Sequence, residues 1–300
     1  MASLACSLFE RSDGLTFAYK LLGRTQPATP LVLVHGLSAV GLLDWFPLAA
    51  SLAESRPVLV FDNRGIGSSR VPKAMERERY TVHDLAEDVV ELVKHLGFRE
   101  VDILGFSMGG MIVQTLLVSA SLPFKVRHAV LAATSAKPAH SDLLQAIPSA
   151  PSGALSLEEK IKLVTPFIHV GYDPTFLRNP QNKTLLYRRI AGYDIRKRLH
   201  LIPPTLPVLV FHGTLDRSVY PSEANYILAG IKHAKFLSFE GVGHMRVFPT
   251  PICPSFRSLT ACRWYDYFDT EYWTTLLNRF LNDEAVDSLL PPALPPFAKL

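Results

Sequence analysis

Cysteine is scarce in this chain, with three residues among 300: Cys6, Cys253 and Cys262. An odd and sparse set does not form a disulfide framework, and it favours a compartment that keeps thiols reduced. The first eleven residues lack a basic start followed by a long apolar core, which argues against a secretory signal. No apolar run reaches the roughly 18 residues that span a bilayer. We therefore expect neither a disulfide-rich secreted protein nor a membrane span.

A strong charge of either sign is also missing. The 31 basic and 27 acidic residues leave a net charge of +4, and no five like charges follow one another. The densest basic stretch, residues 188–198, is typical of a solvated helix face, and neither a zinc-finger nor an RNA-binding signature is present. We therefore expect no nucleic-acid partner. At 48% hydrophobic content, the chain is long enough for one large core, or a core with a small subdomain.

Short apolar runs alternate along the chain with glycine-containing turns and helical patterns. Runs without polar alternation are typical of strands buried on both faces of a parallel sheet. Such runs predict strands at residues 31–34, 58–61, 101–104, 126–132, 208–211 and 236–239. Helical patterns predict helices at residues 43–54, 82–96, 108–121, 222–231 and 270–283. This order predicts an α/β fold with helices on both faces of the sheet.

The alternation stops in two places. Residues 135–204 contain many prolines and helical pieces but no strong strand, which predicts a helical cap inserted between the core segments 1–134 and 205–290. Residues 248–269 form an irregular insert, and residues 291–300 form a proline-rich tail.

The strongest chemical signal is Gly105-Phe106-Ser107-Met108-Gly109-Gly110, directly after one predicted strand and before a predicted helix. In this position G-x-S-x-G is typical of a nucleophile elbow. Because the turn is tight, the side chains two before and two after the serine must be minimal. The helix start also brings backbone N–H groups near a developing oxyanion. The motif predicts Ser107 as a nucleophile.

A serine hydroxyl needs a base, and the base needs an orienting acid. The chain order that accompanies a nucleophile elbow is nucleophile, acid, histidine. Asp216 and His244 follow the strands predicted at 208–211 and 236–239, at the sheet edge where open α/β sheets bind ligands. Asp142 is a rival acid. Of the ten histidines, His244 alone combines the right order, a strand end and a loop.

The loop after the first predicted strand reads His35-Gly36-Leu37-Ser38. Gly36 allows a close backbone approach, and the N–H groups of Leu37 and Met108 are the expected oxyanion donors. Gly36 and Trp45 are candidates for substrate contact.

Five motifs, taken in order, resemble those of the α/β-hydrolase superfamily, and most of all those of ester and lactone hydrolases of the enol-lactonase type. They are Val34-His35-Gly36, Asp62-Asn63-Arg64-Gly65-Ile66-Gly67-Ser68-Ser69, the Ser107 elbow, Gly213-Thr214-Leu215-Asp216 and Gly243-His244. The resemblance implies a mostly parallel sheet of about eight strands with a helical cap after the sixth, and neither a cofactor nor a metal. It also implies that Asp62 and Arg64 organise the site without reacting.

The chain departs from that pattern in two places. About 25 residues separate His244 from the last predicted helix, where roughly ten are usual in the family. The last three residues, Ala298, Lys299 and Leu300, resemble a peroxisomal tripeptide. They predict an import receptor as a partner and a peroxisomal location, with the cytoplasm as the alternative. A peroxisomal location implies a eukaryotic source and suits a secondary-metabolite pathway.

These patterns predict a serine hydrolase that cleaves an ester, thioester or lactone through an acyl-enzyme. The predicted cap is rich in leucine, isoleucine and phenylalanine, which favours a mostly apolar small-molecule substrate, although the same residues would also pack the cap onto the core. One alternative keeps the triad but performs C–C hydrolysis, acyl transfer or lyase chemistry. Another is a non-catalytic ligand-binding protein on the same scaffold.

Overall fold

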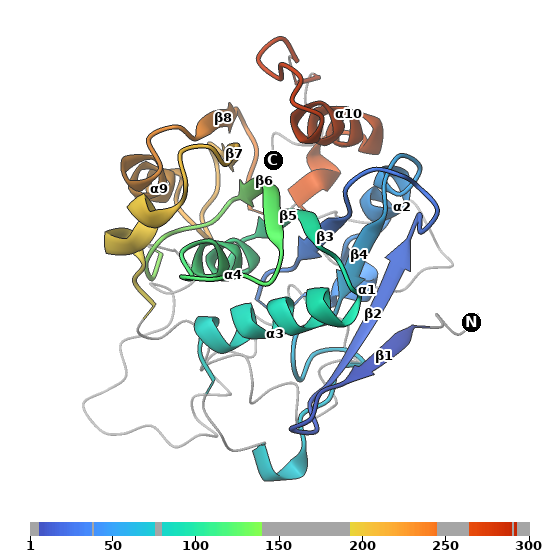
Figure 1. The fold of residues 1–300 in the computed structure, drawn as a ribbon. Helices are drawn as coiled ribbons and strands as arrows, with labels where there is room; N and C mark the ends of the chain where they lie inside the picture. The colour runs from blue at the N-terminus through green and yellow to red at the C-terminus, as the bar shows by residue number, and fades with distance from the viewer. Residues whose placement is uncertain are drawn as a thin grey trace, which may run out of the picture.

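A mixed β-sheet forms the centre of the molecule (Figure 1). The computed structural model describes residues 6–37, 39–75, 80–139, 193–244, 264–289 and 291–292. Within them the sheet has eight strands in the order β1-β2-β4-β3-β5-β6-β7-β8. The strands are β1 Ser7–Glu10, β2 Thr16–Leu22, β3 Leu31–Val34, β4 Val58–Phe61, β5 Glu100–Phe106, β6 Lys125–Ala132, β7 Val208–Gly213 and β8 Lys235–Phe239.

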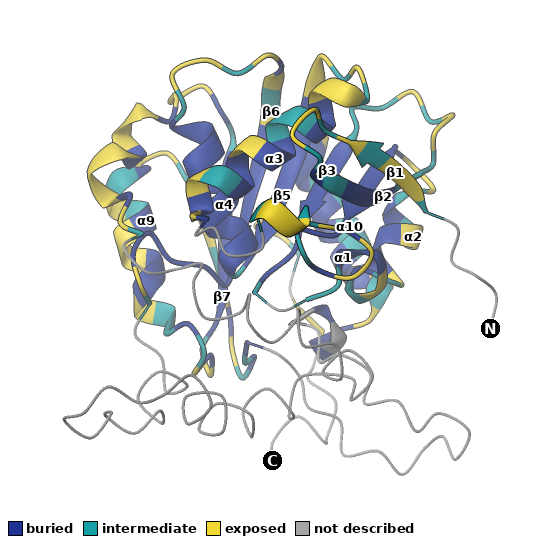
Figure 2. Cartoon of the chain, turned by 90° about the horizontal axis from the view of Figure 1, so that it is seen from below, coloured by how far each residue is buried: buried dark blue, intermediate teal, exposed yellow. Residues whose placement is uncertain are grey.

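The six strands from β3 to β8 are parallel to one another, whereas β1 and β2 run antiparallel to each other and β2 runs antiparallel to β4. The predicted apolar runs all lie in these parallel strands, and β3 and β4 are buried at every position. Figure 2 shows the central part of the sheet in the dark blue of buried residues. The expected α/β fold with an eight-stranded, mostly parallel sheet is confirmed.

The hairpin of β1 and β2 was not among the predicted strands. β1 is largely exposed and β2 is only partly buried, so they lack the continuous apolar run of a buried parallel strand. The signal that the sequence offers is Asp13-Gly14 between two extended segments, a typical hairpin turn. Gly14 has a φ of +86°, which a residue with a side chain adopts at a cost.

Helices cover both faces of the sheet, as expected. One buried cluster joins the sheet to α3 (Val82–His95), α4 (Met108–Leu117) and α9 (Ala224–Gly230). The other joins it to α1 (Gly41–Asp44), α2 (Leu48–Leu52) and α10 (Thr270–Leu281). Short 3-10 helices are η1 Lys73–Met75, η2 Arg196–Leu201, η3 Pro221–Glu223 and η4 Trp264–Tyr267.

The single helix predicted over residues 43–54 is wrong. The structure has α1 and α2 there, separated by a break at Pro47. Proline has no N–H to continue the hydrogen-bond ladder of a preceding helix, so it can begin α2 but cannot extend α1. The prediction overlooked this residue.

Several predicted segments lie wholly or mainly outside the described residues. The cap predicted at 135–204 is described only at its ends, where Ala136, Ile195 and Leu199 pack in the cluster of α4. The insert at 248–269 is described from residue 264, and the tail only at residues 291–292. Ala298, Lys299 and Leu300 lie outside as well, so the import signal stays a prediction. Among the described residues, no helix is long and apolar enough to cross a bilayer.

Candidate active site

Ser107 lies at the sharp turn between β5 and α4. Its φ is +55° and its ψ is −121°, a backbone conformation that a residue with a side chain rarely adopts. A Cβ on Gly105 would lie 2.3 Å from the carbonyl oxygen of Gly109, and a Cβ on Gly109 would lie 2.1 Å from that of Val34. The turn therefore requires glycine at both positions, which confirms the steric reasoning on the motif.

Two hydrogen bonds hold the elbow to the neighbouring strand. The N–H of Ser107 donates to the carbonyl oxygen of Ala132 at 2.9 Å, and the hydroxyl of Thr134 donates to the carbonyl oxygen of Ser107 at 2.6 Å. Thr134 was not a predicted site residue, because its contact depends on the pairing of β5 with β6 and no motif marks it.

The carboxyl ends of three strands bring Ser107, Asp216 and His244 together. Nε2 of His244 lies 3.0 Å from Oγ of Ser107, and Nδ1 of His244 lies 2.7 Å from Oδ2 of Asp216. Because a carboxylate only accepts, Nδ1 carries the hydrogen and leaves Nε2 free to accept one from the serine. The loops after β7 and β8 are joined by a hydrogen bond from the N–H of Leu215 to the carbonyl oxygen of Val242 at 2.9 Å. The three residues predicted from chain order therefore form one connected chain.

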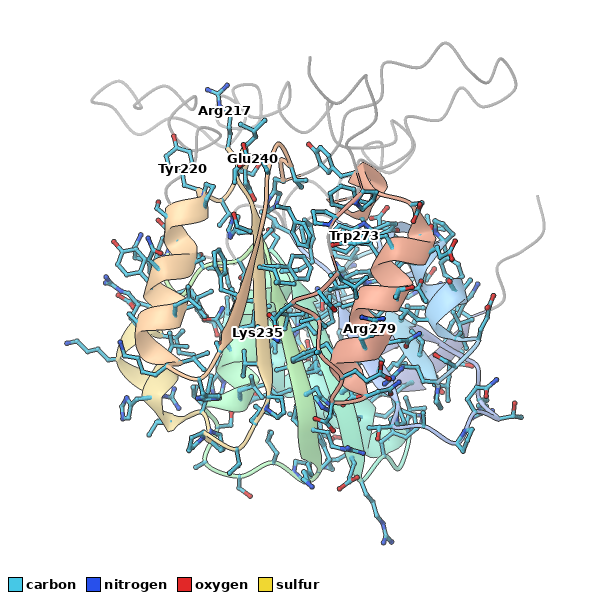
Figure 3. The ribbon with its side chains drawn as sticks, turned by 90° about the horizontal axis from the view of Figure 1, so that it is seen from above. Arg217, Tyr220, Lys235, Glu240, Trp273 and Arg279 are labelled. Carbon is cyan, nitrogen blue, oxygen red and sulfur yellow. The ribbon has the colours of Figure 1, made fainter. Side chains whose placement is uncertain are left out.

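Figure 3 shows this edge of the sheet from a second direction. Arg217 and Tyr220, in the loop after β7, gather with Glu240, which follows β8, away from Lys235 at the start of β8. The loops that carry Asp216 and His244 thus leave the sheet at the same edge.

The carboxylate of Asp216 is buried and fully hydrogen-bonded. Oδ1 accepts from the N–H groups of Ser218 at 2.9 Å and Val219 at 2.8 Å. Burial alone would raise the pKa of Asp216, but the adjacent imidazoles of His244 and His212 outweigh it and lower the pKa to about 2. At neutral pH the group is a carboxylate, which supports a positive charge on His244.

The loop predicted to complete an oxyanion site lies against the nucleophile. A Cβ on Gly36 would lie 3.1 Å from Cβ of Ser107, so only a glycine allows this approach without displacement. Leu37 follows Gly36, and Met108 is the first residue of α4 and is buried. Met108 therefore adjoins Ser107 along the chain, and Leu37 follows the glycine that packs against Ser107, while the role of their N–H groups as oxyanion donors stays a prediction.

His35 fastens this loop to the loop after β4. Its Nε2 accepts from the N–H of Asn63 at 2.9 Å, so Nδ1 is the nitrogen that donates to the carbonyl oxygen of Gly36, also at 2.9 Å. Asp62 accepts from the N–H groups of Leu42 at 3.0 Å and Ser68 at 2.9 Å. Burial raises the pKa of Asp62 to about 6.

Arg64 makes two 2.5 Å hydrogen bonds to Asp88 of α3. Asp62 and Arg64 therefore brace loops and helices, the role that the resemblance implies for them.

The remaining predicted residues have different placements. Trp45 is 2% exposed and stacks on Tyr265 with ring centroids 6.3 Å apart, so the structure places it in the core of α2 and α10. This position favours a packing role over the predicted substrate contact. Asp142 lies outside the described residues. Among those that are described, no three His, Cys, Asp or Glu side chains form a metal-binding group.

One further contact to the histidine loop was not predicted. A Cβ on Gly243 would lie 2.7 Å from the hydroxyl oxygen of Tyr267, which comes from η4 near the end of the long insert. The only sequence signal was the aromatic group at residues 264–268. The end of the insert therefore lies against the loop that ends in His244.

Comparisons with known proteins agree with this geometry. Residues 29–156 match a family model described as the alpha/beta hydrolase fold. The serine hydrolase BPHL of Mus musculus is 26% identical over 229 residues, covering 74% of this chain and 75% of that protein. A proline iminopeptidase of Lactobacillus crispatus is 31% identical over 118 residues, and this chain spans only 40% of its length.

Two solved structures show the same fold at low identity. The esterase RhEst1 from Rhodococcus sp. ECU1013 superimposes with a TM-score of 0.67 at 21% identity, covering 93% of this chain and 99% of that one. The enol-lactonase from Burkholderia xenovorans LB400 gives a TM-score of 0.61 at 20% identity, covering 89% and 97%. At this identity the structural likeness concerns the fold alone.

Proposed function

We propose that this chain, which belongs to the α/β-hydrolase superfamily and is a serine hydrolase, cleaves an ester, thioester or lactone bond of a mostly apolar small molecule. The observation that supports the proposal is the unbroken set of contacts from Oγ of Ser107 through His244 to Asp216, at 3.0 and 2.7 Å. Together with the strained elbow, these contacts activate the serine hydroxyl as a nucleophile.

The proposed reaction proceeds through an acyl-enzyme. Oγ of Ser107 attacks the carbonyl carbon while Nε2 of His244 removes its proton, and Asp216 stabilises the imidazolium that forms. The N–H groups of Leu37 and Met108 hold the oxyanion, and each such donor is worth about 3 kcal/mol in the transition state. His244 then returns the proton to the leaving group, and a water molecule activated by the same imidazole releases the acyl group.

A second candidate is hydrolysis of a peptide bond next to an N-terminal residue. Its support comes from the similarity of this chain to proteins named proline iminopeptidase, such as the one of Lactobacillus crispatus. The same triad serves both reactions, so only the substrate distinguishes them. Turnover of proline p-nitroanilide above that of p-nitrophenyl esters would favour this candidate.

The proposal is tested with a fluorophosphonate probe and p-nitrophenyl esters of increasing acyl length. We expect the wild type to be labelled and to turn over esters, and Ser107→Ala and His244→Ala to lose both activities. His83→Ala is the matched control, because the His83 side chain is 62% exposed on α3 and should leave activity unchanged. A folded wild type that neither labels nor turns over any substrate would contradict the proposal and favour a ligand-binding protein.

A further inference from the structure

The imidazole of His212 lies against the carboxylate that orients His244. His212 is in β7, is 1% exposed, and has its Nε2 atom 2.8 Å from the carbonyl oxygen of Val219. The same nitrogen lies 3.1 Å from Oδ2 of Asp216, the oxygen that His244 contacts at 2.7 Å. Two imidazoles thus share one carboxylate oxygen, and of the two His244 is the one that contacts Ser107.

The contacts of the His212 ring fix its hydrogen. A carbonyl oxygen only accepts, so Nε2 must donate to Val219, and the same N–H lies near Asp216. The buried Nδ1 atom has no hydrogen-bond partner in the part of the chain that the structure describes. A second hydrogen there would be a buried donor without an acceptor, which is unfavourable. The neutral ring with hydrogen on Nε2 therefore fits this site.

Contacts to both carboxylate oxygens hold the Asp216 side chain in one orientation. Oδ1 accepts two backbone N–H groups, and Oδ2 faces the two imidazoles. Charged side chains on the neighbouring elements have other partners. Glu223 in η3 pairs with Lys137 at 3.0 Å, and Lys235 of β8 pairs with Asp287. Arg217, the residue after Asp216, is exposed.

We propose that His212 is a positioning residue of the hydrolytic site, which fixes the Asp216 carboxylate and shares its negative charge with His244. This inference rests on the proposed function and adds to it a residue that does not touch the reacting atoms. A neutral donor on Oδ2 reduces the support that the carboxylate gives to a charged His244. Without that donor, the positive form of His244 gains stability and the carboxylate gains freedom to turn.

These two effects are separable in a pH–rate profile. Loss of the donor moves the acidic limb of the kcat/KM profile to higher pH, because the negative charge of Asp216 then acts on His244 alone. Loss of orientation lowers kcat by roughly ten- to a hundredfold, the usual effect of removing a hydrogen bond to a charged group. A role in packing alone would lower thermal stability without moving the limb.

The experiment compares His212→Phe, which keeps a ring without a donor, with His212→Gln, whose amide nitrogen reaches the position of Nε2. We expect the Phe variant to show the raised limb and the reduced kcat, and the Gln variant to recover most of both. A profile of the Phe variant that superimposes on the wild type would overturn the inference. If the Phe variant does not fold, the Gln variant is compared with the wild type, and a Gln profile that differs from the wild-type profile would overturn the inference.

Nitrogen-15 NMR of the imidazoles in the wild type tests the contact without any turnover. We expect His212 to carry its hydrogen on Nε2, and a hydrogen on Nδ1 would refute the assignment. A wild type that shows the expected spectrum but no fluorophosphonate labelling would count against the proposed function alone. An active wild type with the Nδ1 tautomer would count against the inference alone.

Discussion

A buried charge network fastens the last helix to the end of the sheet away from Ser107, and Arg56 is its centre. Arg56 is 2% exposed and donates through Nη1 to Asp102 at 2.9 Å, through Nη2 to Asn282 at 2.9 Å and through Nε to Asn278 at 3.3 Å. Asp102 also contacts Nδ1 of His128 at 2.8 Å. We predict that Arg56→Met will destabilise the protein far more than the loss of a surface charge.

The magnitude follows from what the substitution leaves behind. Methionine fills much of the space but leaves the Asp102 carboxylate, 1% exposed, with one partner fewer. The amide oxygens of Asn278 in α10 and Asn282 at its end each lose the hydrogen bond from Arg56, although Ser55 still donates to Asn278. Removing one partner of a buried ion pair typically costs 3–5 kcal/mol, and we expect about that loss in the free energy of unfolding. Adding Asp102→Asn to Arg56→Met should cost at least about 1 kcal/mol less than the sum of the two single changes, because the residues are in contact.

Urea unfolding of the single and double variants measures both quantities. Lys94→Met is the matched control, because Lys94 is a half-exposed cation on α3 that pairs with Glu91, and its loss should cost about 0.5 kcal/mol or less. The labelling rate of folded Arg56→Met should equal that of the wild type, since the network lies far from the elbow. If Arg56→Met costs no more than Lys94→Met, or if the two single changes simply add, the network does not stabilise the fold as reasoned.

Three shorter predictions concern the site and the pH dependence of stability. Asp216→Asn should lower kcat about ten-thousandfold with a smaller effect on KM, because the amide no longer selects the His244 tautomer that accepts from serine. Steady-state kinetics of the folded variant measures both quantities. Burial lowers the pKa of His128, but hydrogen bonds to Asp102 and Asp283 outweigh burial, so the pKa in the folded protein is raised. The stability that His128 contributes is therefore full below about pH 6.5 and is lost as the pH rises through the folded pKa. We expect His128→Phe to destabilise the protein more at pH 5.5 than at pH 8.5, as measured by urea unfolding. Gly243→Ala should reduce kcat by displacing the hydroxyl of Tyr267, and a second change, Tyr267→Phe, should restore activity if that contact is the cause.

The parallel part of the fold was predictable because burial on both faces leaves continuous apolar runs. β3 and β4 begin and end where the sequence indicated. The β1–β2 hairpin carries a weaker pattern, since β1 is largely exposed, β2 is only partly buried, and only Asp13-Gly14 marks the turn. The predicted helix at 43–54 failed because the helical pattern was extended across Pro47, which lacks the N–H that would continue the helix.

The candidate site divides in the same way. Ser107, Asp216 and His244 were predictable because each follows a strand and the chain order is fixed by the fold. Thr134 and Tyr267 reach the site through contacts between segments far apart in the sequence, and no local pattern encodes which atoms they will meet. His212 lies only four residues before Asp216, but its contact depends on how the loop after β7 folds back, which the sequence pattern did not indicate. The prediction for Trp45 rested on its closeness in sequence to the Gly36 loop, whereas its burial in the cluster of α2 and α10 favours a packing role.

The central claim is that Ser107 forms a covalent acyl intermediate. It is tested most directly by mixing the protein with an excess of p-nitrophenyl acetate, quenching in acid within the first turnovers, and mapping the peptides by mass spectrometry. We predict an acetyl group on the peptide that contains Ser107, and no such adduct in Ser107→Ala. Ester turnover by the wild type without acylation of that peptide would contradict the account.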